Sequence, residues 1–195
     1  MSPTLLNVVD VEATCWSGPV PDGQANEIIE IGLCVVDLDR GTRVGRDRIL
    51  VRPARSRVSE FCTELTGLTQ AEVDQGVDFA TACATLARQH ESGRRPWASW
   101  GDYDRNQFRR QCAAAGVRYP FGAVHVNAKV AFAEAHACRR QGMAGALRMA
   151  GLPLSGRHHS GADDAWNIAA LVLHLCERGG WPATTASRTP SAAQD

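Results

Sequence analysis

Leu5 to Ala13 reads Leu-Leu-Asn-Val-Val-Asp-Val-Glu-Ala, a stretch typical of a buried central strand because β-branched and apolar residues dominate it. Two carboxylates, Asp10 and Glu12, stand two residues apart within it. Since successive strand side chains alternate between faces, both must point the same way. Like charges on an apolar strand repel and are costly to desolvate unless a cation neutralises them. The pair therefore predicts a divalent-metal site, with a strand end in solvent as the alternative.

The rest of the chain predicts an α/β domain. Strand-like runs at Glu27–Leu38 and Asp47–Arg52 follow turn-rich segments, so short connections favour an antiparallel three-strand meander. Alternating helix and strand then add parallel strands, which gives a mixed sheet flanked by helices. The later elements expected are a helix starting at Thr69, helices at Asp78–Gln89 and Asp104–Ala115, strands at Pro96–Trp100 and Val124–Val126, and helical segments from Lys129 onward, the last running from Asp163 to Arg178.

Length and composition suit one globular domain. The 195 residues are 44% hydrophobic and 22% charged. We expect a single domain over 1–179 and a disordered tail over 180–195, whose composition is rich in Ser, Thr, Pro and Ala. No run approaches the ~18 apolar residues of a membrane helix, and the N-terminus does not resemble a secretory signal. We therefore expect no membrane association and a cytoplasmic location.

Cysteine usage and charge narrow the class further. The 7 cysteines are scattered and never spaced as a Cys-x-x-Cys motif, which favours buried free thiols over a zinc site or disulfides. The 21 basic and 21 acidic residues balance, so any polynucleotide must be held locally. Local basic clusters fit phosphate binding and a solvated helix face about equally. They are Arg94-Arg95, Arg105 with Arg109 and Arg110, and Arg139-Arg140.

Two further acidic segments could complete a metal site. Asp102 and Asp104 lie between a predicted strand and a predicted helix, where either could also act as a helix cap. Asp164 falls in the first turn of the last helix, on the face of apolar residues such as Ile168, where a charge needs a partner. His159 lies five residues earlier on a loop bounded by glycines. Each signal is weak alone, since Asp163 or Asp164 could simply cap a helix and single histidines are common.

Five segments carry more specific patterns, and in them the chain resembles the DEDDh exonucleases of the DnaQ-like superfamily, which has a ribonuclease-H-like fold. The resemblance is greatest to the branch of histone-mRNA exonucleases, enhanced-RNAi exonucleases and KapD-like proteins. It extends from about Leu6 to Leu175. The segments are Asp10-Val-Glu-Ala-Thr-Cys15, Asn26-Glu-Ile-Ile-Glu-Ile31, Ser59-Glu-Phe-Cys-Thr-Glu-Leu-Thr-Gly67, Trp100-Gly-Asp-Tyr-Asp104 and His159-Ser-Gly-Ala-Asp-Asp164-Ala-Trp-Asn-Ile-Ala169.

This resemblance implies a catalytic set. Asp10, Glu12 and Asp164 would be metal ligands, Asp104 the fourth carboxylate, and His159 the general base. Asp104 is preferred to Asp102 because the family places its acid directly after an aromatic residue. Asp164 is preferred to Asp163 because the family's acid follows its histidine by five residues. The implied cofactor is a pair of Mg²⁺ or Mn²⁺ ions, which suit hard carboxylate oxygens.

The resemblance also implies where the terminal nucleotide binds. The turn Thr14-Cys15-Trp16 and the segment from Ser59 to Cys62 would approach it, with Phe61 and Leu65 stacking on the base. Stacking tolerates any sequence because every base has a π-face. An ordinary core aromatic is the alternative for Phe61.

The function implied is 3′-to-5′ hydrolysis of single-stranded nucleic acid to nucleoside 5′-monophosphates. The partner is a single-stranded 3′ end, with RNA favoured over DNA by the Ser59–Gly67 segment. Two alternatives remain: a KapD-like regulatory binding protein, whose protein partner the sequence does not identify, and an exonuclease of DNA proofreading or repair.

Overall fold

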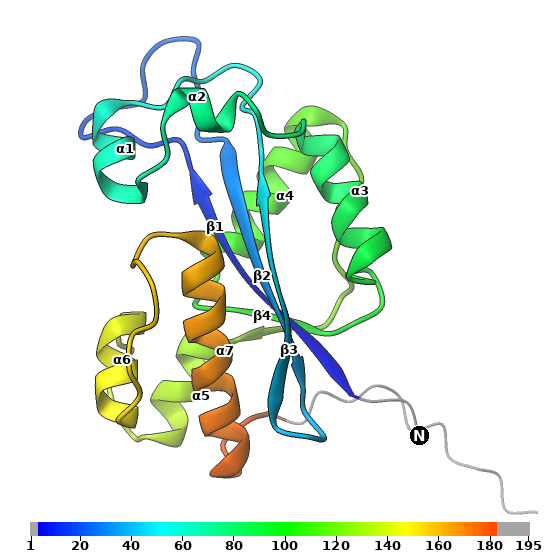
Figure 1. The fold of residues 1–195 in the computed structure, drawn as a ribbon, viewed down its shortest axis with the longest axis vertical. Helices are drawn as coiled ribbons and strands as arrows, with labels where there is room; N and C mark the ends of the chain where they lie inside the picture. The colour runs from blue at the N-terminus through cyan, green and yellow to red at the C-terminus, as the bar shows by residue number, and fades with distance from the viewer. Residues whose placement is uncertain (1–3, 183–195) are drawn as a thin grey trace, which may run out of the picture.

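The computed structural model describes residues 4–182, which fold around a five-stranded mixed sheet of order β3-β2-β1-β4-β5 (Figure 1). The first three strands pair antiparallel as the predicted meander, and β4 and β5 add parallel to β1. The predicted fold class is therefore confirmed. The strands are β1 (Leu5–Ala13), β2 (Ile28–Asp37), β3 (Thr42–Leu50), β4 (Trp97–Ser99) and β5 (His125–Asn127).

Helices cover both faces of the sheet (Figure 1). One hydrophobic cluster joins the sheet to α5, α6 and α7, and another joins it to α3 and α4. The helices are α1 (Glu60–Thr66), α2 (Gln70–Val73), α3 (Phe79–Gln89), α4 (Tyr103–Ala115), α5 (Ala128–Ala135), α6 (Met143–Ala150) and α7 (Gly161–Glu177).

Strand β1 shows how alternation positions the acidic pair. Leu6 and Val8 pack into the cluster beneath α7, whereas Val9 and Val11 pack into the cluster beneath α3 and α4. Residues of even number in this strand thus face α7. Asp10 and Glu12 have the same parity, so the carboxylates continue the face that α7 covers.

The predicted strand boundaries were wrong at the edges of the sheet. The third strand begins at Thr42 rather than Asp47 and ends at Leu50 rather than Arg52. Only the short turn around Gly41, whose φ is +64°, separates it from β2. The polar residues of an exposed edge strand look like a loop in the sequence, yet pairing with β2 makes them extended. The fifth strand is likewise His125–Asn127 instead of Val124–Val126.

Helix boundaries needed smaller corrections. The helix α1 was not predicted, because its N-cap Ser59 has Cys62, not Glu or Gln, at the third helical position. The capping box of Thr69 and Glu72 is confirmed. The last helix begins at Gly161, two residues before the predicted Asp163.

The predicted tail begins too early. Gly180 donates a backbone hydrogen bond of 2.8 Å to the Leu175 carbonyl, and Trp181 packs on the cluster beneath α7. These residues therefore belong to the domain, while 183–195 lie outside the described residues. In the described part of the chain, no helix has the length and apolar character needed to cross a membrane.

Glu27 holds together two connections at the end of the sheet that carries the acids. Its carboxylate accepts backbone hydrogen bonds from Ala54, Arg55 and Ser56 at 3.1, 3.0 and 2.7 Å. Burial raises the pKa of Glu27, but these donors outweigh burial and hold it below the ordinary value of 4.5. The segment after β3 is thus fixed against the start of β2 by one ionised side chain.

We expect Glu27→Gln to lower the free energy of unfolding by about 2–4 kcal/mol, because an amide cannot accept all of these bonds. Urea denaturation at pH 7 measures the loss. The carboxylate stabilises the fold above pH 4.5, and its contribution disappears as pH falls through the lowered folded pKa. The difference from wild type should therefore narrow in acid. The exposed Glu60→Gln is the control, and an equal loss in both variants would contradict this role.

Candidate active site

The candidate site begins where β1 emerges from the core with Asp10 and Glu12. Across the antiparallel pair, Glu12 lies opposite Glu30 of β2, which is fully buried. Glu30 accepts a 2.8 Å ion-paired hydrogen bond from Arg48 through Oε1. Its Oε2 has no hydrogen-bond partner among the described residues. A further buried acid thus adds negative charge behind the pair.

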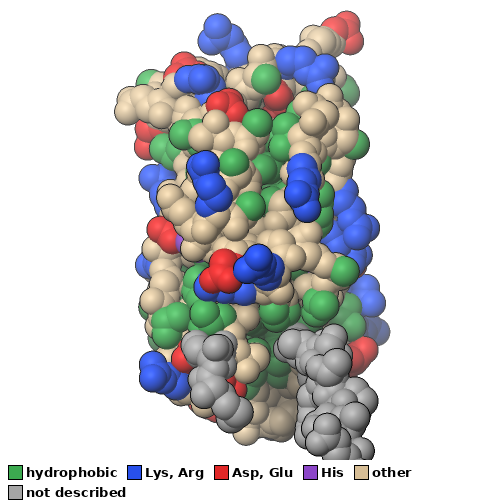
Figure 2. Space-filling model, turned by 90° about the vertical axis from the view of Figure 1, so that its right-hand side faces the viewer, with side chains coloured by type: hydrophobic (Ala, Val, Ile, Leu, Met, Phe, Trp, Pro, Cys, Tyr) green, Lys and Arg blue, Asp and Glu red, His purple; other side chains and the backbone are tan. Residues whose placement is uncertain are grey.

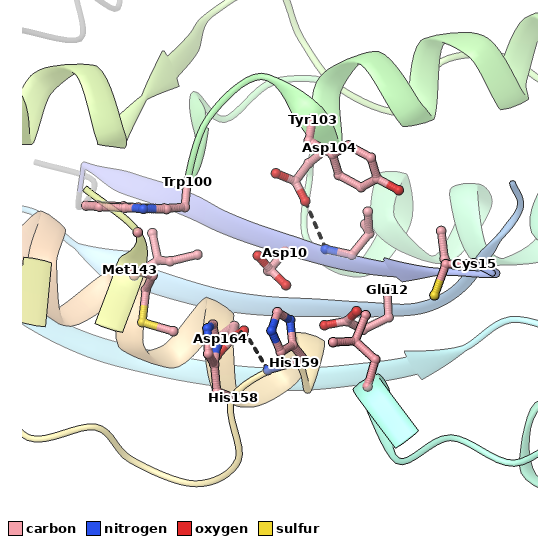
Figure 3. Close-up of a pocket in the computed structure, with 15 residues that line it drawn as sticks. Asp10, Glu12, Cys15, Trp100, Tyr103, Asp104, Met143, His158, His159 and Asp164 are labelled. Atoms are coloured by element: carbon pink, nitrogen blue, oxygen red, sulfur yellow. Dashed lines mark hydrogen bonds and ion pairs between the residues drawn. The ribbon is translucent and has the colours of Figure 1, made fainter. Parts of the chain in front are cut away.

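The first turn of α7 adds Asp164 to this strand end (Figure 3). Oxygen atoms of Asp10, Glu12 and Asp164 all lie within 4.8 Å of one another. Three carboxylates this close, with no thiol or amide among them, match the hard oxygen donors that Mg²⁺ and Mn²⁺ prefer. The residues present therefore fit a divalent metal ion.

A glycine contact lets α7 approach the sheet this closely. A Cβ added to Gly32 of β2 would lie 1.9 Å from the Gly161 carbonyl oxygen, so no larger residue fits. A Cβ added to Gly161 would lie 3.2 Å from the Asp10 carbonyl oxygen. The absence of side chains at this crossing fixes how far Asp164 lies from the β1 carboxylates.

Gly32→Ala should therefore damage stability and activity together. We expect the free energy of unfolding to fall by about 1–3 kcal/mol, because the added methyl group pushes α7 away from the sheet. Nuclease activity should fall by more than the unfolded fraction accounts for, because Asp164 moves away from the β1 acids. Gly45→Ala on β3 is the matched control, since its Cβ would make only ordinary contact, 3.6 Å from a Val35 methyl group. Thermal melts and initial rates report the two effects, and a fully active Gly32→Ala would refute the close-packing argument.

The start of α4 supplies the fourth carboxylate. Asp104 is 4% exposed, and its Oδ1 accepts a 3.0 Å hydrogen bond from the backbone N–H of Val11, between the two β1 acids. Asp102 is exposed and pairs instead with Arg105 at 2.8 Å. The structure thus places Asp104, as preferred from the sequence, in the cleft.

On α7 the structure likewise places Asp164, and not the adjacent Asp163, in the cleft. Asp163 points away from the acids and bonds the Arg157 backbone N–H at 2.8 Å and the guanidinium of Arg46. Asp164 is 5% exposed and faces the cleft.

The pKa values of these acids show how much negative charge is concentrated in the cleft. Burial raises the pKa of Asp10 well above its ordinary value, and Asp104 and Glu12 raise it further. Burial, followed by Asp164 and Glu30, raises the pKa of Glu12 to about 8. Burial also raises the pKa of Asp104 to about 6, against the hydrogen bond from Val11. Protein groups alone do not balance this charge, so the cleft favours a bound cation.

The loop before α7 carries two histidines with different contacts. His158 Nδ1 lies 2.9 Å from Asp164 Oδ2, whereas His159 donates its backbone N–H to the same oxygen at 3.0 Å. The φ of His159 is +63°, a left-handed conformation that non-glycine residues seldom adopt. The His159 ring stacks on that of His158 and projects among the acids (Figure 3). Burial and His158 lower its pKa, which favours the neutral, proton-accepting form.

These residues line one cleft of about 350 Å³. Arg157 joins its two sides by donating to the carbonyl oxygens of Glu64 and Leu65 at 3.2 and 3.5 Å. All five predicted catalytic residues lie in its wall: Asp10, Glu12, Asp104, His159 and Asp164. A buried carboxylate cluster beside a neutral imidazole can hold cations and accept a proton from water.

Comparison with known proteins supports this chemistry. A protein-family model described as "Exonuclease" matches residues 8–172, nearly the whole described chain. The chain belongs to this exonuclease family. Its predicted membership is therefore confirmed, and the protein is a nuclease.

Individual proteins similar to this chain are also exonucleases. The 3'-5' exonuclease Snipper of Drosophila melanogaster is 30% identical, covering 93% of this chain and 73% of the fly protein. Human ERI1 exoribonuclease 2 is 28% identical over 89% of this chain but only 28% of its own length. The solved nuclease domain of 3'hExo, described as a DEDDh family member bound to rAMP, is 26% identical with a TM-score of 0.83, covering 91% and 94% of the two chains.

Of the predicted nucleotide contacts, the exonuclease places two in the cleft wall, Cys15 and Leu65. The Thr14 side chain is fully buried elsewhere, where its hydroxyl donates to the Ala25 carbonyl at 2.9 Å. Trp16 and Phe61 do not line the cleft, and Phe61 is 38% exposed, so its reading as a core aromatic was wrong. Nucleotide contacts of all these residues stay predictions.

Sequence reasoning missed several residues of the cleft. His158 holds Asp164, and Tyr103 lines the wall while donating to Asn26 Oδ1 at 3.1 Å. Trp100 and Met143 form the end of the cleft opposite Cys15 (Figure 3). Tyr103 and Trp100 belong to a matched segment and could have been found, but Met143 has no local signal.

Proposed function

We propose that this exonuclease removes nucleoside 5′-monophosphates from the 3′ end of single-stranded nucleic acid, with RNA preferred over DNA. The observation that carries the proposal is the cleft in which carboxylates from β1, α4 and α7 meet His159. The direction and the RNA preference are supported by the names of the relatives, which include human 3'-5' exoribonuclease 1, 27% identical over 88% of this chain.

Each residue then has a distinct task. Asp10, Glu12 and Asp164 would bind the divalent ions, and Asp104 would complete the set from α4. Mg²⁺ or Mn²⁺ ions held by these carboxylates would lower the pKa of a bound water and neutralise charge on the departing oxygen. His159 accepts the proton of the attacking water through its neutral ring. His158, in the wall of the cleft, fixes the orientation of Asp164.

The cysteines support a proposed cytoplasmic location. All seven are free, and four of them are buried. Free thiols persist in a reducing compartment.

A side-by-side degradation assay tests the proposed activity. Matched 5′-labelled RNA and DNA oligonucleotides are incubated with Mg²⁺, Mn²⁺ or a chelator, and chromatography identifies the released product. We expect a ladder shortened from the 3′ end, faster for RNA and absent with chelator. Faster DNA hydrolysis would favour the proofreading or repair alternative. No metal-dependent hydrolysis of either strand would favour a regulatory binding protein.

A further inference from the structure

The two ends of the cleft differ in a way that gives the bound strand a direction. Cys15 lies at one end, and Trp100 and Met143 lie at the other, with the acids between them (Figure 3). If the terminal nucleotide occupies the Cys15 end, as the sequence predicts, the scissile phosphate lies at the acids. The remaining strand must then leave past Trp100 and Met143.

A line of cations begins at this exit. A Cβ added to Gly101 would lie 3.7 Å from Lys129 Nζ, so the Lys129 ammonium group lies beside Gly101, the residue that follows Trp100. Trp100 Nε1 donates a 3.1 Å hydrogen bond to the Gln141 carbonyl, so the α5–α6 connection is attached to the exit. Arg139 and Arg140 immediately precede Gln141.

The arginines are available to a ligand. Both are exposed, and neither forms an ion pair with any described residue. They border a surface depression of about 540 Å³ that contains one acidic residue, Glu134. Arg140 is three residues from Met143, at most ~11 Å of chain and comparable to roughly three stacked nucleotides.

Other basic side chains are less well placed. On the side of the molecule at the right of Figure 1, where α3 lies, most of them stand apart from one another (Figure 2). Lys129, Arg139 and Arg140 adjoin the end of the cleft where a strand would emerge, through Gly101 and Gln141. We call these three residues the exit track.

We propose that the exit track binds the phosphates of the strand on the 5′ side of the scissile bond, a few nucleotides from the 3′ end. This inference rests on the proposed function. A chain with balanced charge has no global field to retain a polyanion, so local cations at the exit would hold the strand between successive cleavages. Contact through phosphates carries no base sequence, which suits an enzyme that degrades any sequence.

The test compares substrates that do and do not reach the exit track. The double variant Arg139→Glu/Arg140→Glu is assayed on a 12-nucleotide oligouridylate and on a dinucleotide. We expect KM for the 12-mer to rise at least ~10-fold with similar kcat, while dinucleotide hydrolysis stays near wild type. Binding of the 12-mer is measured by fluorescence anisotropy in Ca²⁺ at several salt concentrations. The slope of log K against log salt concentration should become less steep by about 1.4, which corresponds to two lost phosphate contacts.

Controls separate the possible outcomes. Arg88→Glu on α3 removes an exposed arginine of the opposite helical layer and should leave both substrates unaffected. A 4-thiouridine three nucleotides from the 3′ end should crosslink to the peptide around 138–142, and a terminal one should not. Unchanged 12-mer KM, or equal losses on both substrates, would overturn the exit track while leaving the nuclease assignment intact. A wild-type protein inactive on both substrates would overturn the proposed function instead.

Discussion

Asp164→Asn is expected to reduce metal-dependent hydrolysis by more than ~1000-fold, because metal binding contributes several kcal/mol to phosphodiester cleavage. The substitution keeps the size of the side chain and removes a charge that lies within 4.8 Å of the Asp10 and Glu12 carboxylates. Stability should not fall in the presence of a chelator, since one of several mutually repelling carboxylates is gone. Initial rates on 3′-labelled RNA and melting temperatures with and without Mg²⁺ measure both effects.

Its neighbour Asp163 provides the matched control. Asp163→Asn affects only the outer contacts with Arg46 and the Arg157 backbone. It should therefore lower the free energy of unfolding by about 1 kcal/mol or less and keep most of the activity. The wild type and Asp163→Asn should gain stability from Mg²⁺ through preferential binding to the folded state, whereas Asp164→Asn should gain much less. Full activity or an undiminished Mg²⁺ effect in Asp164→Asn would remove that residue from the metal site.

His159→Ala is expected to lower kcat by about 10²–10⁴-fold, the usual contribution of a general base. Mg²⁺ should still stabilise this variant, because the imidazole belongs to the proton transfer and the carboxylates hold the ions. Burial lowers the pKa of His159, so the wild-type rate should fall only when pH drops below its ordinary value of 6.5. This fall in rate at low pH should disappear in the variant, and added imidazole should restore part of the rate.

The comparison with His158→Ala distinguishes the two stacked rings. His158 touches Asp164 rather than projecting among the acids, so its loss should weaken metal binding and reduce kcat less than the loss of His159. The assignment of the base must be reversed if His158→Ala, and not His159→Ala, loses the fall in rate at low pH and regains activity with imidazole.

How far the sequence anticipated this site depends on the range of each interaction. The pair Asp10 and Glu12 could be predicted because one strand fixes their relation through backbone alternation alone. The choice of Asp104 over Asp102 needed the family pattern, since both residues could cap α4. The capping box at Thr69 was visible because its partner is three residues away, whereas the edge strand β3 was misplaced because its pairing with β2 is not local.

The sequence by itself determined the meander and the parity of the β1 acids, and it predicted the five residues that meet in the cleft, because each rests on backbone periodicity or on matched motifs. Only the tertiary structure decided that Gly32 and Gly161 let α7 approach the sheet, that His158 holds Asp164, and that Met143 closes the cleft. The physical reason is that these features arise between segments far apart in the chain, where packing distance decides which groups meet. No local pattern of residues encodes that distance.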